Sequence, residues 1–230
     1  RNATVNDISW KTNKNFNNSL ADYLLNKNHN RAHDEWLQVY PSAWSDVVET
    51  LAGNRFVSAE KAALLPDELN KYPNFVIQNT RVNFNFNQEV FNYNKNKYLP
   101  HREYKLVPVD EAIFEKLQGS VVPKNFWHSA AVFSAFGQGF SLIDGDEPVA
   151  TSYSSTVDEG VLEIGIETKA ECRGKGLAFV VCQALIEFCL ARDTLPIWAC
   201  RLENIGSFNL AQKLGFEANL YLPYYRLSKN

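Results

Sequence analysis

The sequence predicts a protein of the α/β (α+β) class, with a sheet flanked by helices and an additional α+β subdomain at the N-terminus. Two observations predict this class. From about residue 102 onward, strand-like and helix-like stretches alternate at short intervals. The part before residue 102 is rich in asparagine, but aromatic residues interleave with the polar ones, which is typical of folded structure. With 230 residues, 45% of them hydrophobic, the chain is long enough to bury a core.

The first part of the chain, residues 1–101, is predicted to form the small α+β subdomain. Apolar residues recur at helical spacing between residues 18 and 51, which indicates two helices with a break near Pro41. Further along, Val82, Phe84 and Phe86 alternate with asparagines, and this two-residue period is typical of a half-buried strand. We find no cluster of catalytic residue types in this part.

The second part, residues 102–230, is predicted to follow the order β-α-α-β-β-β-α-β-α-β. Alternating apolar residues indicate the strands, and apolar residues three or four apart indicate the helices. In chain order, the predicted elements are the strand REYKLVPVD, the helices EAIFEKLQG and FWHSAAVFSAFG, the strands GFSLID, PVATSYSST and VLEIGIET, a long apolar helix, the strand LPIWAC, a short helix ending at Leu214 and a strand pair in FEANLYLPYYRLS.

Charge, hydropathy and cysteine usage exclude several classes of protein. The net charge of -3 gives the chain no overall attraction to nucleic acid or to an anionic membrane. No apolar stretch approaches the roughly 20 residues of a membrane span, and the N-terminal residues lack the apolar core of a secretory signal. We therefore expect a cytoplasmic protein with neither nucleic-acid nor membrane partners. The four cysteines lack zinc-ligand spacing, so we expect reduced, mostly buried thiols and no metal: Cys172, Cys182, Cys189 and Cys200.

The stretch ECRGKGLAF lies between a predicted strand and the long apolar helix, where glycines and free N–H groups favour an anion. A magnesium-nucleotide loop needs Ser or Thr after its lysine, but Lys175 is followed by Gly176. A dinucleotide loop needs a third glycine where Phe179 stands. Taken alone, the loop is better explained as a plain glycine cap with two solvated cations, Arg173 and Lys175.

The spacing Arg173-x-x-Gly176-x-Ala178 resembles the (Q/R)-x-x-G-x-(G/A) pyrophosphate loop of the GNAT superfamily of acyl-CoA-dependent N-acyltransferases. Downstream, ENIGSFNLAQKLGF resembles the second signature of that family, in which Asn204 opens a helix that a Gly-Phe pair closes. The resemblance covers roughly residues 102–230. The sequences of the two segments are most similar to those of a bacterial subgroup that includes zwittermicin-resistance-type acetyltransferases with an extra N-terminal half.

This resemblance implies a mixed, mostly antiparallel central sheet and a direct transfer of an acetyl group from acetyl-CoA to an amine of a small molecule. It also implies that backbone N–H groups of the loop hold the pyrophosphate and that the preceding strand pairs with the pantetheine arm. The cofactor-binding residues implied in this way are Ile166, Thr168, Arg173, Gly174, Lys175, Gly176, Leu177, Ala178, Asn204 and Ser207. Whether the protein is a monomer or a homodimer stays open.

An ammonium substrate must lose a proton before it attacks, so a carboxylate is the expected base. Glu163 and Glu167 lie four residues apart on the predicted strand and therefore on the same side of it. Glu163 is the preferred base, and Glu167 is the second candidate. His128 and Asp144 are further alternatives.

The leaving thiolate raises a separate question. Many family members place a Tyr seven residues after the Asn of the second signature, whereas this chain has Ala211 there. Ser207 is the substitute that we expect to contact the sulfur or the cofactor, with Tyr224 or Tyr225 as alternatives. The missing Tyr also keeps a second function open, namely a catalytically idle acyl-CoA-binding or regulatory interaction module.

Overall fold

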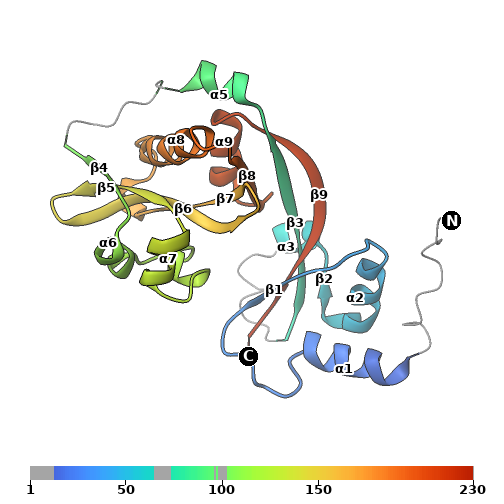
Figure 1. Cartoon of the computed structure of the whole chain (residues 1–230). Coiled ribbons are helices and arrows are strands. Elements are labelled where there is room, and N and C mark those ends of the chain that lie inside the picture. Colours follow the sequence, from blue (N-terminus) through green and yellow to red (C-terminus); the bar gives the residue numbers. More distant parts are fainter. Residues whose placement is uncertain (1–12, 65–73, 96, 98–102, 230) are drawn as a thin grey trace. The chain divides into compact units, whose positions relative to one another are not determined.

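The computed structural model describes residues 13–64, 74–95, 97 and 103–229 (Figure 1). The chain forms two compact units. Unit 1 takes Arg1–Arg81, Arg201–Glu203 and Tyr221–Asn230, and unit 2 takes Val82–Cys200 and Asn204–Leu220. This division differs from the expected subdomains 1–101 and 102–230, whose boundary lies outside the described residues. The physical reason is that two long strands, β3 (Val76–Phe86) and β9 (Phe216–Leu227), each contribute residues to both units.

Unit 1 contains helices and short strands around a small apolar core. Its elements, besides parts of β3 and β9, are α1 (Lys14–Leu24), β1 (Glu35–Gln38), α2 (Trp44–Ala52), β2 (Phe56–Val57) and α3 (Ala59–Leu64). β1 pairs with β9 in antiparallel fashion and β2 pairs with β3 in parallel fashion. Both predicted helices are present, but a strand, rather than a simple break, lies between them, and its Leu37 packs against the core that contains Leu24 and Tyr225.

Unit 2 follows the predicted order of elements. Its elements, besides parts of β3 and β9, are α5 (Gln88–Asn94), β4 (Lys105–Pro108), α6 (Glu111–Lys116), α7 (Ala130–Phe136), β5 (Gly139–Asp144), β6 (Glu147–Asp158), β7 (Val161–Thr168), α8 (Leu177–Leu190), β8 (Leu195–Arg201) and α9 (Ile205–Lys213). Two predictions were wrong in detail. Helix α6 ends at Lys116, before Gly119, and FEANLYLPYYRL forms one long strand instead of a pair.

Within unit 2, the strands from β8 to β4 pair in the order β8-β7-β6-β5-β4. Of these four described pairs, β7–β8 is parallel and the others are antiparallel. Figure 1 shows α8 and α9 on one face of these strands and α6 and α7 on the other face. Among the described residues, the mostly antiparallel sheet with helices on its faces confirms the predicted fold class. This arrangement positions the glycine loop at the end of β7, directly before α8.

The long apolar helix α8 forms the centre of the unit 2 core. Eight of its residues are buried, and they lie all around the helix instead of along one stripe. Cys182 and Cys189, expected to be buried, have no exposed surface. Burial raises the pKa of both thiols, that of Cys189 to about 12. All four cysteines are free, as predicted, and only Cys200 is partly exposed.

The Gly-Phe pair after α9 has a clear structural role. Gly215 has a φ of +88°, and a Cβ at this position would lie 2.7 Å from the backbone oxygen of Asn87 and 2.7 Å from the backbone nitrogen of Phe91. Any other residue would have to combine a left-handed backbone with a clash against α5. Phe216 then enters the core with no exposed surface, so the second signature fixes the return of the chain into β9.

Candidate functional site

The strand β7 has one edge that is only half paired. It pairs with β8 at Val161, Leu162 and Glu163, and the pairing ends there although both strands continue. The N–H of Leu195 donates to the carbonyl of Gly160. Because alternate residues of a strand direct their backbone groups to the same side, the N–H and C=O groups of even-numbered residues of β7 face β8. Beyond Ile164, this edge of β7 is therefore open.

The two predicted pantetheine positions lie along this open edge. The register directs the backbone N–H and C=O groups of Ile166 outward from the sheet edge. At Thr168, the N–H donates to a carboxylate oxygen of Glu167 at 3.2 Å, and the C=O accepts from Arg173 Nε at 3.2 Å. The hydroxyl of Thr168 is buried and has no hydrogen-bond partner in the described part of the chain. Such an orphaned polar atom fits a site where a polar ligand supplies the partner.

The glycine loop presents a row of backbone donors at the N-terminus of α8. Gly174 and Gly176 have φ angles of +79° and +78°, and no side chain caps this end of the helix. Within the described ranges, the N–H groups from Gly174 to Ala178 meet no protein acceptor. A Cβ on Gly174 would meet nothing within 4 Å, so the approach to these donors is open to an anion. Lys175 is exposed beside them.

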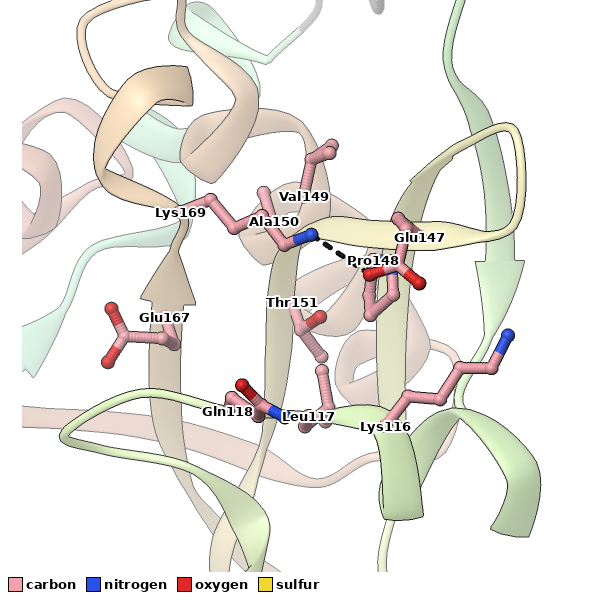
Figure 2. A pocket seen from close by; sticks show the side chains of 10 residues that line it. All are labelled: Lys116, Leu117, Gln118, Glu147, Pro148, Val149, Ala150, Thr151, Glu167 and Lys169. Atoms are coloured by element: carbon pink, nitrogen blue, oxygen red, sulfur yellow. Dashed lines mark hydrogen bonds and ion pairs between the residues drawn. The ribbon is translucent and has the colours of Figure 1, made fainter.

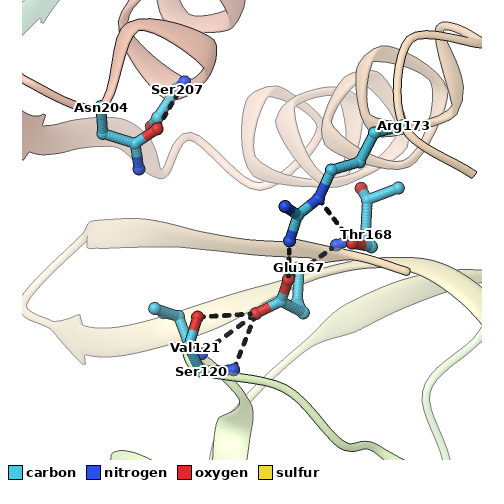
Figure 3. A network of polar contacts seen from close by, with 7 residues as sticks. All are labelled: Ser120, Val121, Glu167, Thr168, Arg173, Asn204 and Ser207. Atoms are coloured by element: carbon cyan, nitrogen blue, oxygen red, sulfur yellow. Dashed lines mark hydrogen bonds and ion pairs between the residues drawn. The ribbon is translucent and has the colours of Figure 1, made fainter. Parts of the chain in front are cut away.

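Glu167 is the centre of a polar network that joins β7 to its neighbours (Figure 3). One carboxylate oxygen accepts hydrogen bonds from the N–H and the hydroxyl of Ser120 and from the N–H of Val121, at 3.1–3.3 Å. The other oxygen accepts from the Thr168 N–H and from Arg173 Nη2, which lies 3.3 Å away. These donors occupy the lone-pair directions of the carboxylate. The geometry therefore favours a positioning role for Glu167.

We expect Glu167→Gln to lower the free energy of unfolding by about 1–3 kcal/mol, because the new NH2 group faces donors instead of accepting from them. Urea unfolding measures this change. Glu147→Gln is the matched control, since Glu147 also pairs with a cation, Lys169, but is 64% exposed, whereas Glu167 is 16% exposed. For this control we expect about 0–1 kcal/mol. Equal effects of the two substitutions would contradict the positioning role.

Glu163 lies on the same face of β7 as Glu167, because Glu163 is two residues before Gly165 and Glu167 is two residues after it. Its side chain is partly buried, and its backbone carbonyl accepts from the Ser155 hydroxyl at 3.1 Å. Glu163 is also the last residue of β7 that pairs with β8. It therefore stands where the strand edge begins to open.

Asn204 and Ser207 form the start of α9. The side chain of Asn204 accepts from the Ser207 N–H at 3.2 Å and so caps the helix. The Ser207 hydroxyl accepts from the indole N–H of Trp198, a residue that sequence reasoning did not assign, at 3.2 Å. Since Trp can only donate, the proton of the Ser207 hydroxyl stays available for a second partner. Ala211 is fully buried in the core, so α9 packs closely where many family members carry a Tyr.

The remaining candidates lie elsewhere. His128 and Asp144 are exposed, the first before α7 and the second at the end of β5. Tyr224 and Tyr225 belong to unit 1, where Tyr224 stacks on Trp36 and Tyr225 is buried in the core. Burial raises the pKa of Tyr225 above its usual value.

An open pocket of about 210 Å³ lies on the face of unit 2 that carries α6 (Figure 2). Charged and polar side chains from α6, β6 and the end of β7 surround it. The lining residues are Lys116, Leu117, Gln118, Glu147, Pro148, Val149, Ala150, Thr151, Glu167 and Lys169. Of the predicted site residues, only Glu167 lines it, and Figure 2 shows the carboxylate of Glu167 turned away from the Lys169–Glu147 ion pair.

The described residues contain no group of three or more His, Cys, Asp or Glu side chains placed to hold a metal ion. In the same part of the chain, no helix combines the length and apolar character that crossing a bilayer requires.

A family model described as GNAT acetyltransferase matches residues 9–225. The chain belongs to this family. The match begins far upstream of residue 102, so the GNAT model includes most of the N-terminal half as well. The uncharacterized N-acetyltransferase YdfB of Bacillus subtilis (strain 168) is 32% identical over 165 residues, which cover 70% of this chain and 59% of that relative. The similarity thus spans less than two thirds of the relative's length.

Solved structures agree on the GNAT fold. A GCN5-related N-acetyltransferase-like protein from Streptococcus suis has a TM-score of 0.64 at 22% identity, covering 83% of this chain and 70% of that one. A Drosophila protein has a TM-score of 0.56 at 12% identity, covering 86% of this chain and 62% of that one. At these identities the likeness establishes the fold alone.

Proposed function

We propose that this protein is an N-acetyltransferase that moves the acetyl group of acetyl-CoA directly to an amine of a small molecule. The observation that carries the proposal is the continuity of two binding features. The open edge of β7 around Ile166 leads into the row of free N–H groups from Gly174 to Ala178. An extended pantetheine arm that ends in a pyrophosphate needs these two features in this order, and the chain belongs to a family of acetyltransferases.

The residues that line this path fit the cosubstrate. Ile166 offers a backbone donor and acceptor to the amide groups of a pantetheine arm, as an added strand would use them. Thr168 contributes its unpartnered hydroxyl. The loop glycines let phosphate oxygens approach the backbone, and the dipole of α8 favours their negative charge. Arg173 contributes less directly, because its guanidinium is engaged with Glu167 and with the Thr168 carbonyl.

The transfer is a substitution at the thioester carbonyl. The neutral amine nitrogen attacks the carbonyl carbon, a C–N bond forms, and one C=O electron pair moves to the oxygen. When the pair returns, the C–S bond breaks and the sulfur leaves with its electrons. In our proposal, Glu163, directly or through a water molecule, takes the proton that the amine loses. The products are an amide and the CoA thiolate, which takes up a proton from solvent while Glu163 releases to solvent the proton that it took from the amine.

Ser207 is proposed to stabilise the departing sulfur. Its hydroxyl oxygen is already held by the indole N–H of Trp198 at 3.2 Å, which orients the hydroxyl and leaves its proton free for the thiolate. A hydrogen bond to an anionic acceptor is stronger than one between neutral groups. A thiolate is a stable anion near neutral pH. A hydrogen bond from Ser207 can therefore take the place of the Tyr that many family members carry at the position of Ala211, and no full proton transfer to the sulfur is needed.

Binding of acetyl-CoA is the first test. If the dissociation constant is micromolar, 1 mM acetyl-CoA is expected to stabilise the protein by about 4 kcal/mol, and a thermal unfolding scan shows this as a higher Tm. ATP at the same concentration is the control for an anion without a pantetheine arm. An unchanged Tm in the presence of acetyl-CoA would contradict the proposal.

Thiol release with a panel of amines then tests turnover. Binding of acetyl-CoA without any thiol release would instead indicate the catalytically idle acyl-CoA-binding module.

A further inference from the structure

The hydroxyl group of Tyr153 is a buried polar group that the fold does not use. Tyr153 lies on β6, its side chain has no exposed surface, and its hydroxyl has no hydrogen-bond partner in the described part of the chain. A buried hydroxyl without a partner is costly, and a Phe would supply the same ring without that cost. This residue therefore needs a reason other than packing.

The position of the ring supplies that reason. Tyr153 pairs directly with Gly165 across β6 and β7. A Cβ on Gly165 would lie 2.5 Å from Cζ of the Tyr153 ring and 2.9 Å from its hydroxyl oxygen. The end of the ring thus lies directly over Gly165, and only glycine leaves room for it. The phenol reaches from β6 across to the strand whose far edge is open, and the next residue, Ile166, directs its N–H to that edge.

The two carboxylates of β7 flank this hydroxyl along the same face. Glu163 lies two residues before Gly165 and Glu167 two residues after it. Burial, and to a smaller extent the negative charge of Glu167, raises the pKa of Tyr153 well above its usual range. The phenol therefore keeps its proton at physiological pH and acts as a neutral hydrogen-bond donor.

We propose that Tyr153 is a catalytic residue whose O–H donates a hydrogen bond to the acyl oxygen of the thioester and to the oxyanion that this oxygen becomes during transfer. The inference rests on the proposed function. The Tyr153 O–H lies on the face of the sheet over Gly165, whereas the Ile166 N–H lies in the plane of the sheet and is left for the pantetheine arm. A fixed donor of this kind stabilises the charge that develops on the oxygen when the amine attacks.

Contact with the acyl group requires the cover over the hydroxyl to open. Phe126 is the neighbour that allows this movement, because its ring lies 6.0 Å from that of Tyr153 and its side chain is half exposed. Phe126 directly follows the short 3-10 helix Pro123–Asn125, whose end its N–H caps, so the movement is that of its exposed side chain and not of the backbone. The hydroxyl is shielded from water until substrate enters, which preserves the strength of its hydrogen bond to the oxyanion.

Tyr153→Phe tests the inference because it removes the hydroxyl alone. We expect the ligand-free variant to be more stable, with a Tm about 2–4 °C higher, since an unsatisfied buried group is lost. We also expect it to bind acetyl-CoA. The direct readout is the infrared carbonyl band of acetyl-CoA labelled with 13C in the acetyl group. A hydrogen bond lowers its frequency in the wild-type complex, and the variant is expected to shift the band back toward the value of free acetyl-CoA.

Tyr221→Phe is the matched control, because the hydroxyl of Tyr221 belongs to a half-exposed side chain; it should change neither Tm nor the carbonyl band. If acetyl-CoA binds but the band is identical in wild type and Tyr153→Phe, the role of Tyr153 is overturned while the proposed function stands. A lower Tm for Tyr153→Phe would also overturn it, since the hydroxyl would then have a structural partner. If acetyl-CoA binds neither protein, both the proposed function and this inference fail.

Discussion

Glu163→Gln is expected to lower the rate of acetyl transfer by about 100- to 10,000-fold while leaving the binding of acetyl-CoA unchanged. The amide has nearly the size and shape of the carboxylate, so the strand and its pairing with β8 persist. What it lacks is the ability to take the proton that the amine loses. The rate is measured as thiol release with the best amine from the panel, and binding is measured as the shift in Tm.

Two matched substitutions sharpen this test. Asp158→Asn removes an exposed carboxylate from the last residue of β6, and it should leave the rate of acetyl transfer unchanged. Glu167→Gln should lower the free energy of unfolding, as argued above. Its effect on the rate of acetyl transfer per folded molecule should be smaller than that of Glu163→Gln. A large loss of rate in Glu167→Gln together with full activity in Glu163→Gln would reverse the assignment of the base.

Gly174→Val is expected to weaken acetyl-CoA binding by about 10- to 100-fold. The side chain would stand where the backbone must approach the pyrophosphate, and losing one hydrogen bond to a charged group costs about 1.5–3 kcal/mol. The left-handed φ of Gly174 adds about 1–2 kcal/mol of backbone strain, which lowers stability without ligand as well. Titration of Tm with acetyl-CoA separates the two effects.

Gly160→Val controls for the strain. Gly160 has a φ of +81°, close to the +79° of Gly174, and a Cβ at either position meets nothing within 4 Å. Both variants should therefore lose similar stability without ligand. Only Gly174→Val should lose affinity, because Gly160 lies in the turn between β6 and β7, away from the free N–H groups. Equal affinities for acetyl-CoA in the two variants would argue against the loop as the pyrophosphate site.

The element types of unit 2 were predictable because they depend on local periodicity. The alternation in VLEIGIET indicated β7, and the Asn204 cap and the Gly215-Phe216 pair marked both ends of α9. The family relationship was predictable from the spacing of the same residues. The strand β1 was missed because it has only four residues, EWLQ, which is too short for the alternation of more and less buried side chains to stand out from the turns on both sides.

From sequence, Glu163 ranked above Glu167 as the base, but no sequence feature indicated the contacts that Glu167 makes. The four-residue spacing places both on one face of β7. The contacts of Glu167 come from Ser120 and Val121, 46 or 47 residues away in the chain, whose N–H groups donate to its carboxylate. Similarly, Trp198 and Ser207 lie on separate elements, and only folding brings the indole to the hydroxyl.

By itself, the sequence determined the α/β class, the order of elements from residue 105 onward, the glycine loop and membership of an acyltransferase family, because these depend on residue types at short spacing. The tertiary structure decided where β7 parts from β8, that Ser120 donates to Glu167, and that the ring of Tyr153 lies over Gly165. The β7–β8 pairing and the donors to Glu167 join segments that lie far apart in the chain. The register of a strand pair follows from the hydrophobic pattern of both whole strands and from the geometry of the turn, and so no short motif encodes these features.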